Sequence, residues 1–477
     1  MHQQNRVRFA ACVALMIGLP GQISCPAAPF RDGDVVCFLG DSITKGGWYP
    51  AFIELFYVTR FPESRIDFHN CGCGGDRASS IMEATEFRLD ADVFARKPTH
   101  VVVMLGMNDV ERSLYGPQPK GDHVAVARQA ALDRYEDTLE AICRRVRDNG
   151  AQLILVTPSC YDETAVIDAP AREPLKGVNE ALAECAGVVR RLAAVHGALL
   201  ADAHALTDRV NREEQARDPR FSITGAGKSW NDRVHPGPVG SFLIAFAVLV
   251  AQEPFPPVAT IAVDTLGKTQ PVRCVIEDLD AGDERLSWTC REQGLPCVMP
   301  VAAREGLRFV PFAESFNQEI LRCEGLAPGM HALAIDGQEI GVFPTADFAR
   351  GINLATLPTA PQYRQAELVE ARLEPVRRAG ENLREPATLR YGMARRNAAG
   401  ATDRKRDWRS PADYEATVGA VLLKQPDPKN PSAWLRAALA EVTQPGELTR
   451  THAEAVAELR RSARPVPHRY EITPRQR

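Results

Sequence analysis

The sequence lacks a strong imbalance of charge, a long apolar run in its body and any internal repeat of fixed period. Its 57 Lys and Arg residues nearly balance 61 Asp and Glu residues, which gives a formal net charge of -4. Composition therefore gives no general electrostatic basis for binding nucleic acid or an anionic membrane surface. The apolar run at residues 242–250 is much shorter than the roughly 20 residues that cross a bilayer as a helix. We expect it to form a buried helix and expect no integral membrane segment.

The sequence also lacks cysteines at the spacing typical of a metal site. Cys71-Gly72-Cys73 has a single intervening residue and no second pair nearby, which disfavours a zinc site, and we expect neither a metal nor a cofactor. Six of the twelve cysteines lie in or beside apolar segments and are expected to be buried as small hydrophobic residues: Cys37, Cys71, Cys73, Cys143, Cys160 and Cys185. Four others lie close enough in sequence for two disulfides, in any of three pairings: Cys274, Cys290, Cys297 and Cys323.

The N-terminus has the pattern of a secretory signal peptide. Arg6 and Arg8 precede an apolar run at residues 9–19, and small residues follow at residues 24–28. We therefore assign residues 1–27 to a signal peptide, exclude them from the fold and expect a secreted or periplasmic protein. Cys25 leaves a lipoprotein as an alternative, although Gln22 stands where such signals usually carry Leu.

The segment at residues 28–257 alternates between short apolar runs that end in turn residues and longer stretches with helical periodicity. Apolar runs of this kind suit strands that are buried on both faces of a parallel sheet. Strands that alternate with helices predict an α/β domain covered on both faces. The expected strands are residues 35–39, 65–68, 101–105, 153–156 and 198–201, and the expected helices are residues 50–59, 125–149 and 175–196.

The pattern of apolar residues changes after a proline-rich linker at residues 254–257. Short β-type runs follow at residues 272–276, 287–289, 307–311, 319–323, 332–335 and 339–343. Asp336-Gly337 between the last two suits a two-residue hairpin turn. We assign residues 258–345 to a small β-sandwich and residues 346–477 to a helical C-terminal region. The clearest helices there are residues 365–374, which we expect Pro375 to end, and residues 434–442. The mixed-charge run at residues 403–407 is expected to be a solvated loop.

Three polar motifs follow three successive strands of the first domain. Gly40-Asp41-Ser42 follows the first strand, the run from Asn70 through Gly74-Gly75 to Arg77 follows the second, and Gly106-Met107-Asn108-Asp109 follows the third. Each motif alone is typical of a helix cap or a turn. Open α/β sheets bind ligands at the carboxyl edge of their strands, however, and all three motifs fall at that edge.

A fourth motif, Asp232-Arg233-Val234-His235, lies late in the same domain. A serine nucleophile needs a base, and the base needs an acceptor on its second ring nitrogen. An isolated loop histidine is usually unrelated to catalysis, but Asp232 lies three residues before His235 and can supply this acceptor. The four motifs together supply a nucleophile, a base with its orienting carboxylate, and backbone and amide donors for an oxyanion.

The order and content of these motifs resemble the SGNH (GDSL-type) hydrolase superfamily over residues 33–255. The resemblance implies a flavodoxin-like α/β/α sandwich with Ser42 as nucleophile, His235 as base and Asp232 as its orienter. It also implies an oxyanion hole formed by the N–H groups of Ser42 and Gly75, with Gly74 as the alternative, and by the Asn108 side chain. A Gly-x-Ser-x-Gly motif is absent at Ser42, which disfavours the α/β-hydrolase fold.

The substrate is less constrained by the sequence. Trp48, Tyr49 and Arg77 are candidate substrate-binding residues, because aromatic rings and an Arg near the catalytic edge would suit a sugar. The alternative for Trp48 and Tyr49 is packing beneath a loop. The chain resembles bacterial esterases that remove acetyl groups from polysaccharides, so we expect hydrolysis of short acyl esters on a carbohydrate. The alternatives are a lysophospholipase or general short-chain esterase, and a glycan-binding or surface protein with incidental esterase activity. No sequence pattern indicates the oligomeric state.

Overall fold

The computed structural model describes residues 30–116, 121–167, 173–224, 232–282, 285–398 and 406–475. The expected signal peptide, Cys25 and most of the mixed-charge run at residues 403–407 lie outside the described residues. Within the described ranges, no helix combines the length and apolar character needed to cross a membrane.

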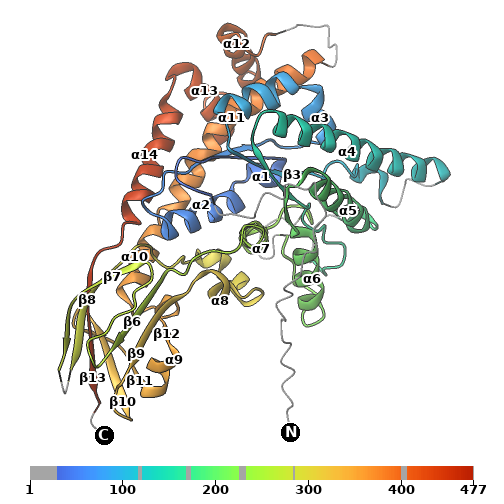
Figure 1. The fold of residues 1–477 in the computed structure, drawn as a ribbon. Coiled ribbons are helices and arrows are strands. Elements are labelled where there is room, and N and C mark those ends of the chain that lie inside the picture. The colour runs from blue at the N-terminus through green and yellow to red at the C-terminus, as the bar shows by residue number, and fades with distance from the viewer. Residues whose placement is uncertain are drawn as a thin grey trace.

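The first domain is built on a five-stranded parallel sheet with the order β2-β1-β3-β4-β5. Helices surround this sheet in the ribbon view (Figure 1). The strand order reverses direction between β1 and β3, which creates a crevice at their carboxyl ends. The strands are β1 (Val35–Gly40), β2 (Asp67–Gly72), β3 (His100–Met104), β4 (Gln152–Val156) and β5 (Leu199–Ala201). The predicted α/β fold is therefore confirmed.

Helices cover both faces of this sheet. Because strand-helix-strand connections are right-handed, the connection from β1 to β2 and those from β3 to β5 place their helices on opposite faces. Accordingly α2 contacts α7, while α4 contacts α3 and α5. The helices of this domain are α1 (Ser42–Lys45), α2 (Trp48–Arg60), α3 (Ala78–Glu83), α4 (Asp122–Asp148), α5 (Val178–His196), α6 (Ala203–Gln215) and α7 (Pro238–Val250). The last of these is almost entirely buried, as the apolar run at residues 242–250 predicts.

The strand β2 is displaced from its predicted position. Residues 65–68 were expected to form this strand, but it spans Asp67–Gly72 and contains His69 and Asn70. It lies at the edge of the sheet, and its first four residues are partly or fully exposed. An edge strand tolerates polar residues, so an apolar run is a poor guide to its bounds.

The second unit is a β-sandwich of a five-stranded sheet, β11-β10-β13-β8-β7, and a three-stranded sheet, β12-β9-β6. Buried residues of both sheets form one core that includes Trp288, Leu321 and Leu333. The predicted hairpin is confirmed, with Asp336 and Gly337 at φ +52° and +76°. The strands are β6 (Ala259–Asp264), β7 (Cys274–Ala281), β8 (Leu286–Glu292), β9 (Glu319–Glu324), β10 (Met330–Ile335), β11 (Gln338–Pro344), β12 (Ile352–Asn353) and β13 (His468–Pro474).

Two strands of the sandwich come from the region predicted to be helical. The strand β13 pairs with β10 on one side and β8 on the other, and β12 pairs with β9. The boundary expected at residue 345 therefore does not coincide with the end of the sandwich. The pairing of β13 depends on strands more than 120 residues earlier in the chain, which no local pattern reveals.

The segment between β8 and β9 packs on the first domain. Its predicted strand at residues 307–311 is wrong, because a 3-10 helix spans Val301–Arg308 and α8 spans Phe312–Phe316. Prolines at positions 300 and 311 flank this helix and cannot donate to a strand ladder. Phe312 and Phe316 pack against Phe242 and Phe56, with ring centroids 5.4 Å and 5.7 Å apart.

Helices make up most of the remaining C-terminal region. A short helix, α9 (Thr345–Arg350), precedes β12. The other helices are α10 (Pro361–Glu370), α11 (Leu373–Ala398), α12 (Pro411–Leu422), α13 (Ala433–Thr443) and α14 (Glu447–Ser462). The expectation that Pro375 ends a helix is wrong: α10 has already ended, and Pro375 lies in the first turn of α11. Proline is tolerated there because that N–H has no intrahelical acceptor.

Every cysteine that the structure describes is buried and free, which confirms the burial expected of the first six. The four cysteines considered for disulfides are also free. Cys274 faces Glu292 and Cys290 faces Ile276 on the paired strands β7 and β8, so the two cysteines are not directly opposed. Cys297 belongs to the core of the first domain, and Cys323 belongs to the core of the sandwich.

Candidate active site

The turn between β1 and α1 presents Ser42 at the carboxyl edge of the sheet. A Cβ atom at Gly40 would lie 2.1 Å from Thr44 Oγ1 and 2.7 Å from the Met104 carbonyl oxygen, so only glycine fits there. Asp41 is buried and accepts a hydrogen bond from the Ile43 N–H at 2.9 Å. The cap expected of this motif is therefore present, and Asp41 supplies it, which leaves the Ser42 side chain partly exposed.

The structure brings Ser42, His235 and Asp232 together although Ser42 lies far from the other two in sequence. His235 Nε2 lies 2.7 Å from Ser42 Oγ, and His235 Nδ1 faces Asp232 Oδ2 in a short contact. Asp232 Oδ1 also accepts hydrogen bonds from the N–H groups of Val234 and His235, both at 3.0 Å. Partial burial raises the pKa of Asp232, but these hydrogen bonds outweigh burial and lower it to about 2. Asp232 is thus a carboxylate throughout the neutral range.

The loop that carries His235 is fixed by contacts between Arg233 and the segment at residues 162–165. Arg233 is buried, has φ +63° and donates from its guanidinium to the carbonyl oxygens of Asp162 and Ala165, both at 3.2 Å. The Arg233 carbonyl accepts from the Asp162 N–H at 3.0 Å. After His235 the chain enters α7, which has a proline in its first turn and is buried along its length. His235 is therefore held between the contacts of Arg233 and the buried helix α7.

The Gly75 and Asn108 motifs lie at the same edge of the sheet. Gly75 is exposed, has φ +79°, and a Cβ there would meet no atom within 4 Å. Asn108 is tied to the glycine motif, because its side-chain Nδ2 donates to the Asp76 carbonyl at 3.0 Å. In the described part of the chain, the N–H groups of Ser42 and Gly75 donate to no protein acceptor. Such donors at the carboxyl edge of the sheet can stabilise an oxyanion.

Two buried aspartates organise these loops. Asp109 accepts from the Ala78 N–H at 2.8 Å, and Asp41 receives a long contact of 3.4 Å from Asn108 Nδ2. Burial raises the pKa of Asp109 to about 7 and that of Asp41 to about 6. At pH 7 the Asp109 carboxyl is therefore partly protonated, whereas that of Asp41 is still largely ionised.

The three candidate substrate-binding residues differ in their surroundings. Tyr49 is fully buried, and its hydroxyl is hydrogen-bonded to Thr44 Oγ1 at 2.9 Å, so the expectation that it contacts substrate is wrong. Its ring packs into the core beneath the nucleophile turn. Trp48 is partly exposed and lies 4.4 Å from the Arg377 guanidinium. Arg77 is paired with Glu111 at 2.9 Å and remains partly exposed beside the glycine motif.

Sequence reasoning missed a buried ionic cluster next to the glycine motif. Arg88 donates to Asp76 Oδ2 at 2.7 Å and 3.0 Å and to Asp92 Oδ2 at 2.5 Å. Arg112 also donates to Asn108 Oδ1 at 3.3 Å. The sequence signal for this cluster was the charged Arg88 between the apolar Phe87 and Leu89, and that pattern is too common to identify a site.

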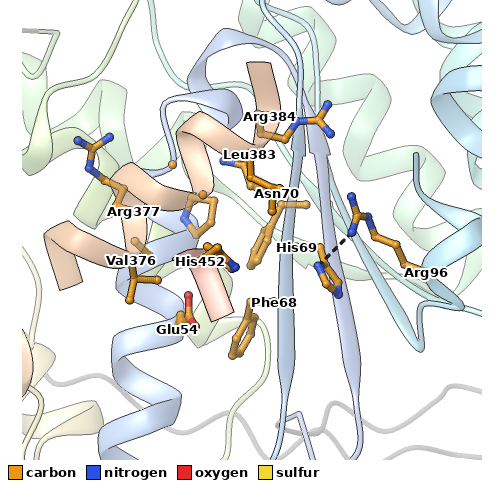
Figure 2. A pocket seen from close by; sticks show the side chains of 15 residues that line it. Glu54, Phe68, His69, Asn70, Arg96, Val376, Arg377, Leu383, Arg384 and His452 are labelled. Carbon is orange, nitrogen blue, oxygen red and sulfur yellow. Dashed lines mark hydrogen bonds between the residues drawn. The ribbon is translucent and has the colours of Figure 1, made fainter. Parts of the chain in front are cut away.

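A cavity between the first domain and the C-terminal helices lies apart from the triad (Figure 2). Its lining includes Glu54, His69, Arg96 and His452 but none of Ser42, Asp232 and His235. Among the described residues, no group of three or more His, Cys, Asp or Glu side chains is placed to hold a metal ion.

Comparisons with known proteins find relatives among ester hydrolases. Residues 38–241 match the GDSL-like Lipase/Acylhydrolase family. An acetylxylan esterase of Geobacillus stearothermophilus is 27% identical over 232 residues, which make up 46% of this chain and 93% of that protein. A solved structure of an acetylxylan esterase from the same organism is 24% identical with a TM-score of 0.36 and covers 47% of this chain and 96% of its own.

A second solved structure matches almost the whole chain. It is described as a gut microbial diltiazem-metabolizing enzyme, is 27% identical, has a TM-score of 0.77, and covers 94% of this chain and 99% of its own. The sandwich and the C-terminal helices thus have counterparts in another enzyme. Residues 38–241 thus form a GDSL-like lipase/acylhydrolase domain of the SGNH type, and the protein is a carboxylic ester hydrolase.

Proposed function

We propose that the protein hydrolyses short acyl esters, with O-acetyl groups on a carbohydrate as its substrate, through an acyl-enzyme formed on Ser42. The observation that carries this proposal is the 2.7 Å contact between Ser42 Oγ and His235 Nε2, with Asp232 on the opposite ring nitrogen. A hydroxyl in hydrogen-bond contact with an imidazole, itself oriented by a carboxylate, is the arrangement that activates a serine for acyl transfer.

The mechanism has two halves. In the first, His235 Nε2 takes the Ser42 proton while Ser42 Oγ attacks the ester carbonyl carbon, and the protonated His235 then delivers that proton to the departing alcohol. In the second, His235 takes a proton from water, the hydroxide attacks the acyl-enzyme, and the acid leaves as Ser42 recovers its proton. Both tetrahedral intermediates carry an oxyanion that the N–H groups of Ser42 and Gly75 and the Asn108 amide stabilise.

The choice of an acetylated carbohydrate is supported by the acetylxylan esterase, whose sequence aligns along 93% of its length. Trp48 and Arg77, both partly exposed near the nucleophile turn and the glycine motif, are the residues we assign to sugar contacts. The expected signal peptide would place the enzyme outside the cytoplasm, where polysaccharides are met. N-terminal sequencing of the mature protein tests that expectation.

The second candidate is an esterase for small-molecule esters, favoured by the diltiazem-metabolizing enzyme that matches nearly the full chain. Lysophospholipids, the substrates of the lysophospholipase alternative, are compared in the same experiment. The sandwich packs on the first domain, where Arg273 donates to the Arg60 carbonyl at 2.5 Å, which favours a structural role for it over an independent glycan-binding module.

The experiment compares acetate release from acetylated xylan and xylooligosaccharides with turnover of diltiazem, lysophospholipids and p-nitrophenyl esters of rising chain length. Ser42→Ala is expected to abolish all ester hydrolysis while the melting temperature stays unchanged. Ser79→Ala, at a partly exposed serine in α3, is the matched control and is expected to retain full activity. Activity that persists in Ser42→Ala would overturn the mechanism, and a preference for octanoate or longer esters would overturn the carbohydrate substrate.

A further inference from the structure

The helix α11 lies outside the family segment at residues 38–241 but contacts two of the loops that carry proposed catalytic groups, the nucleophile turn and the glycine motif. Figure 2 shows Arg377, Leu383 and Arg384 of α11 beside Asn70 of β2. The helix contacts β2, α2 and α3 of the first domain, and it also contacts α13 and α14 of the C-terminal region. Its position depends on the C-terminal region as a whole.

The first set of contacts holds the nucleophile turn. Arg377 donates to the Gly46 carbonyl at 3.0 Å, and Glu385 accepts a charge-assisted hydrogen bond from Lys45 at 3.0 Å. The Glu385 side chain is mostly buried. Lys45 and Gly46 come three and four residues after Ser42, so these contacts fix the end of the helical turn that Ser42 begins.

The second set of contacts holds the glycine motif. Arg384 donates to the Gly72 carbonyl at 3.1 Å and to both carboxylate oxygens of Asp92, at 2.6 Å and 3.0 Å. Asp92 in turn accepts from Arg88, and Arg88 also binds Asp76. The four charged side chains, Arg384, Asp92, Arg88 and Asp76, are at most 4% exposed. A continuous chain of charged hydrogen bonds therefore joins α11 to the residue that follows Gly75.

Gly75 cannot hold its own position. It has no side chain, has φ +79° and has open space where a Cβ would be. Gly75 lies in a turn closed by a hydrogen bond from the Asp76 N–H to the Cys73 carbonyl at 3.2 Å, so the direction of its N–H depends on the residues that anchor this turn at its two ends, Gly72 and Asp76. Arg384 reaches the first directly and the second through Asp92 and Arg88. The side chains of Arg384, Asp92 and Arg88 are buried, so replacing their hydrogen bonds by bonds to water is costly in free energy. This hydrogen-bonded series therefore restricts the movement of the glycine motif.

We propose that α11 is part of the catalytic apparatus of this esterase, and that Arg384 is a positioning residue which aims the Gly75 N–H at the oxyanion. The proposal rests on the function proposed for Ser42. It assigns a role in catalysis to a helix more than 300 residues away from the nucleophile in sequence.

Arg384→Lys tests the proposal with the charge on Asp92 still paired. A single ammonium group cannot reproduce the forked contacts to Gly72 and Asp92. We expect kcat for p-nitrophenyl acetate to fall roughly 10- to 100-fold, the range for a small misplacement of a catalytic group, with KM within about twofold of wild type. The shape of the pH profile stays unchanged, because His235 and Asp232 are untouched.

Arg378→Lys is the matched control, since Arg378 is exposed on the same helix and pairs only with Glu374 in the described structure. It is expected to keep wild-type kcat. The double variant Arg384→Lys with Asp92→Asn should lose little more kcat than the stronger single variant, because both act through one chain. All rates are measured well below the melting temperature of each variant.

A folded Arg384→Lys protein with kcat within twofold of wild type would overturn the proposal, as would an equal loss in Arg378→Lys. If Arg384→Lys does not fold, Glu385→Gln decides the matter from the nucleophile side: a several-fold loss of kcat at unchanged KM supports the role of α11, and wild-type kcat overturns it. Failure of the function proposed for Ser42 is distinguishable, because Ser42→Ala would then retain activity whatever Arg384 does.

Discussion

The exchange Asp232→Asn tests the proposed orienting residue with little disturbance of the backbone. Asp232 Oδ1 accepts from the N–H groups of Val234 and His235, and Oδ2 faces His235 Nδ1. An asparagine keeps one oxygen for both N–H groups, so the loop should keep its conformation. Its NH2 group, a donor, then faces Nδ1 in place of a carboxylate oxygen.

The expected magnitude follows from the tautomer of His235. A donor opposite Nδ1 stabilises the imidazole that carries its proton on Nε2, the nitrogen 2.7 Å from Ser42 Oγ. That nitrogen can then no longer accept the Ser42 proton. The same exchange in a Ser-His-Asp protease lowers kcat by about 10⁴, which corresponds to about 5 kcal/mol in the barrier. We expect a loss of that order with KM nearly unchanged.

The assay is initial-rate hydrolysis of p-nitrophenyl acetate, read beside the melting temperature. Asp218→Asn is the matched control, since exposed Asp218 also accepts from a backbone N–H two residues later, that of Arg220 at 3.0 Å, and it should keep full activity. Asp232→Ala should additionally lower the melting temperature, because it removes both backbone contacts. A folded Asp232→Asn enzyme with kcat within tenfold of wild type would refute the orienting role.

Two further predictions concern stability. Burial raises the pKa of Asp109 from 3.8 to about 7, so between these values the unfolded state has lost a proton that the folded state still holds, and stability falls as pH rises. In wild type the free energy of unfolding, measured with urea, should fall by roughly 3 to 4 kcal/mol between pH 4 and pH 7, and Asp109→Asn should remove this fall. The same dependence of the unfolding free energy on pH in wild type and Asp109→Asn would contradict the raised pKa of the buried carboxyl. Truncation after residue 467 removes β13 from between β10 and β8 and should abolish cooperative folding of the sandwich, whereas truncation after Pro474 should not; equal melting curves for the two truncated proteins would count against the strand's role.

The first domain was largely predictable because its elements are locally encoded. Buried parallel strands such as β3 are continuous apolar runs, and long helices such as α4 carry a regular apolar face. The motifs after these strands could be placed at one edge because parallel strands share a direction. The proximity of Ser42, Asp232 and His235 was expected from that topology together with the family resemblance.

The remainder depends on contacts between distant segments. The edge strand β2 carries polar residues, and Tyr49 lies in the core only because α2 packs against the sheet. The position of β13 is set by two strands far earlier in the chain. The Arg384–Asp92 pair joins residues 292 positions apart, and no pattern of spacing relates such residues before the fold is known.

The central place of β13 also constrains when the sandwich can fold during synthesis. Strands β8 and β10 are synthesised before the helical region, but the position between them stays empty until that region has followed and residues 468–474 have been added. Domains tend to fold during synthesis from the N-terminal side, so the first domain can be complete while the sandwich still exposes two unpaired strand edges. Unpaired edges invite pairing with other chains, so until the last strand is added the sandwich is exposed to mispairing that chaperones would prevent.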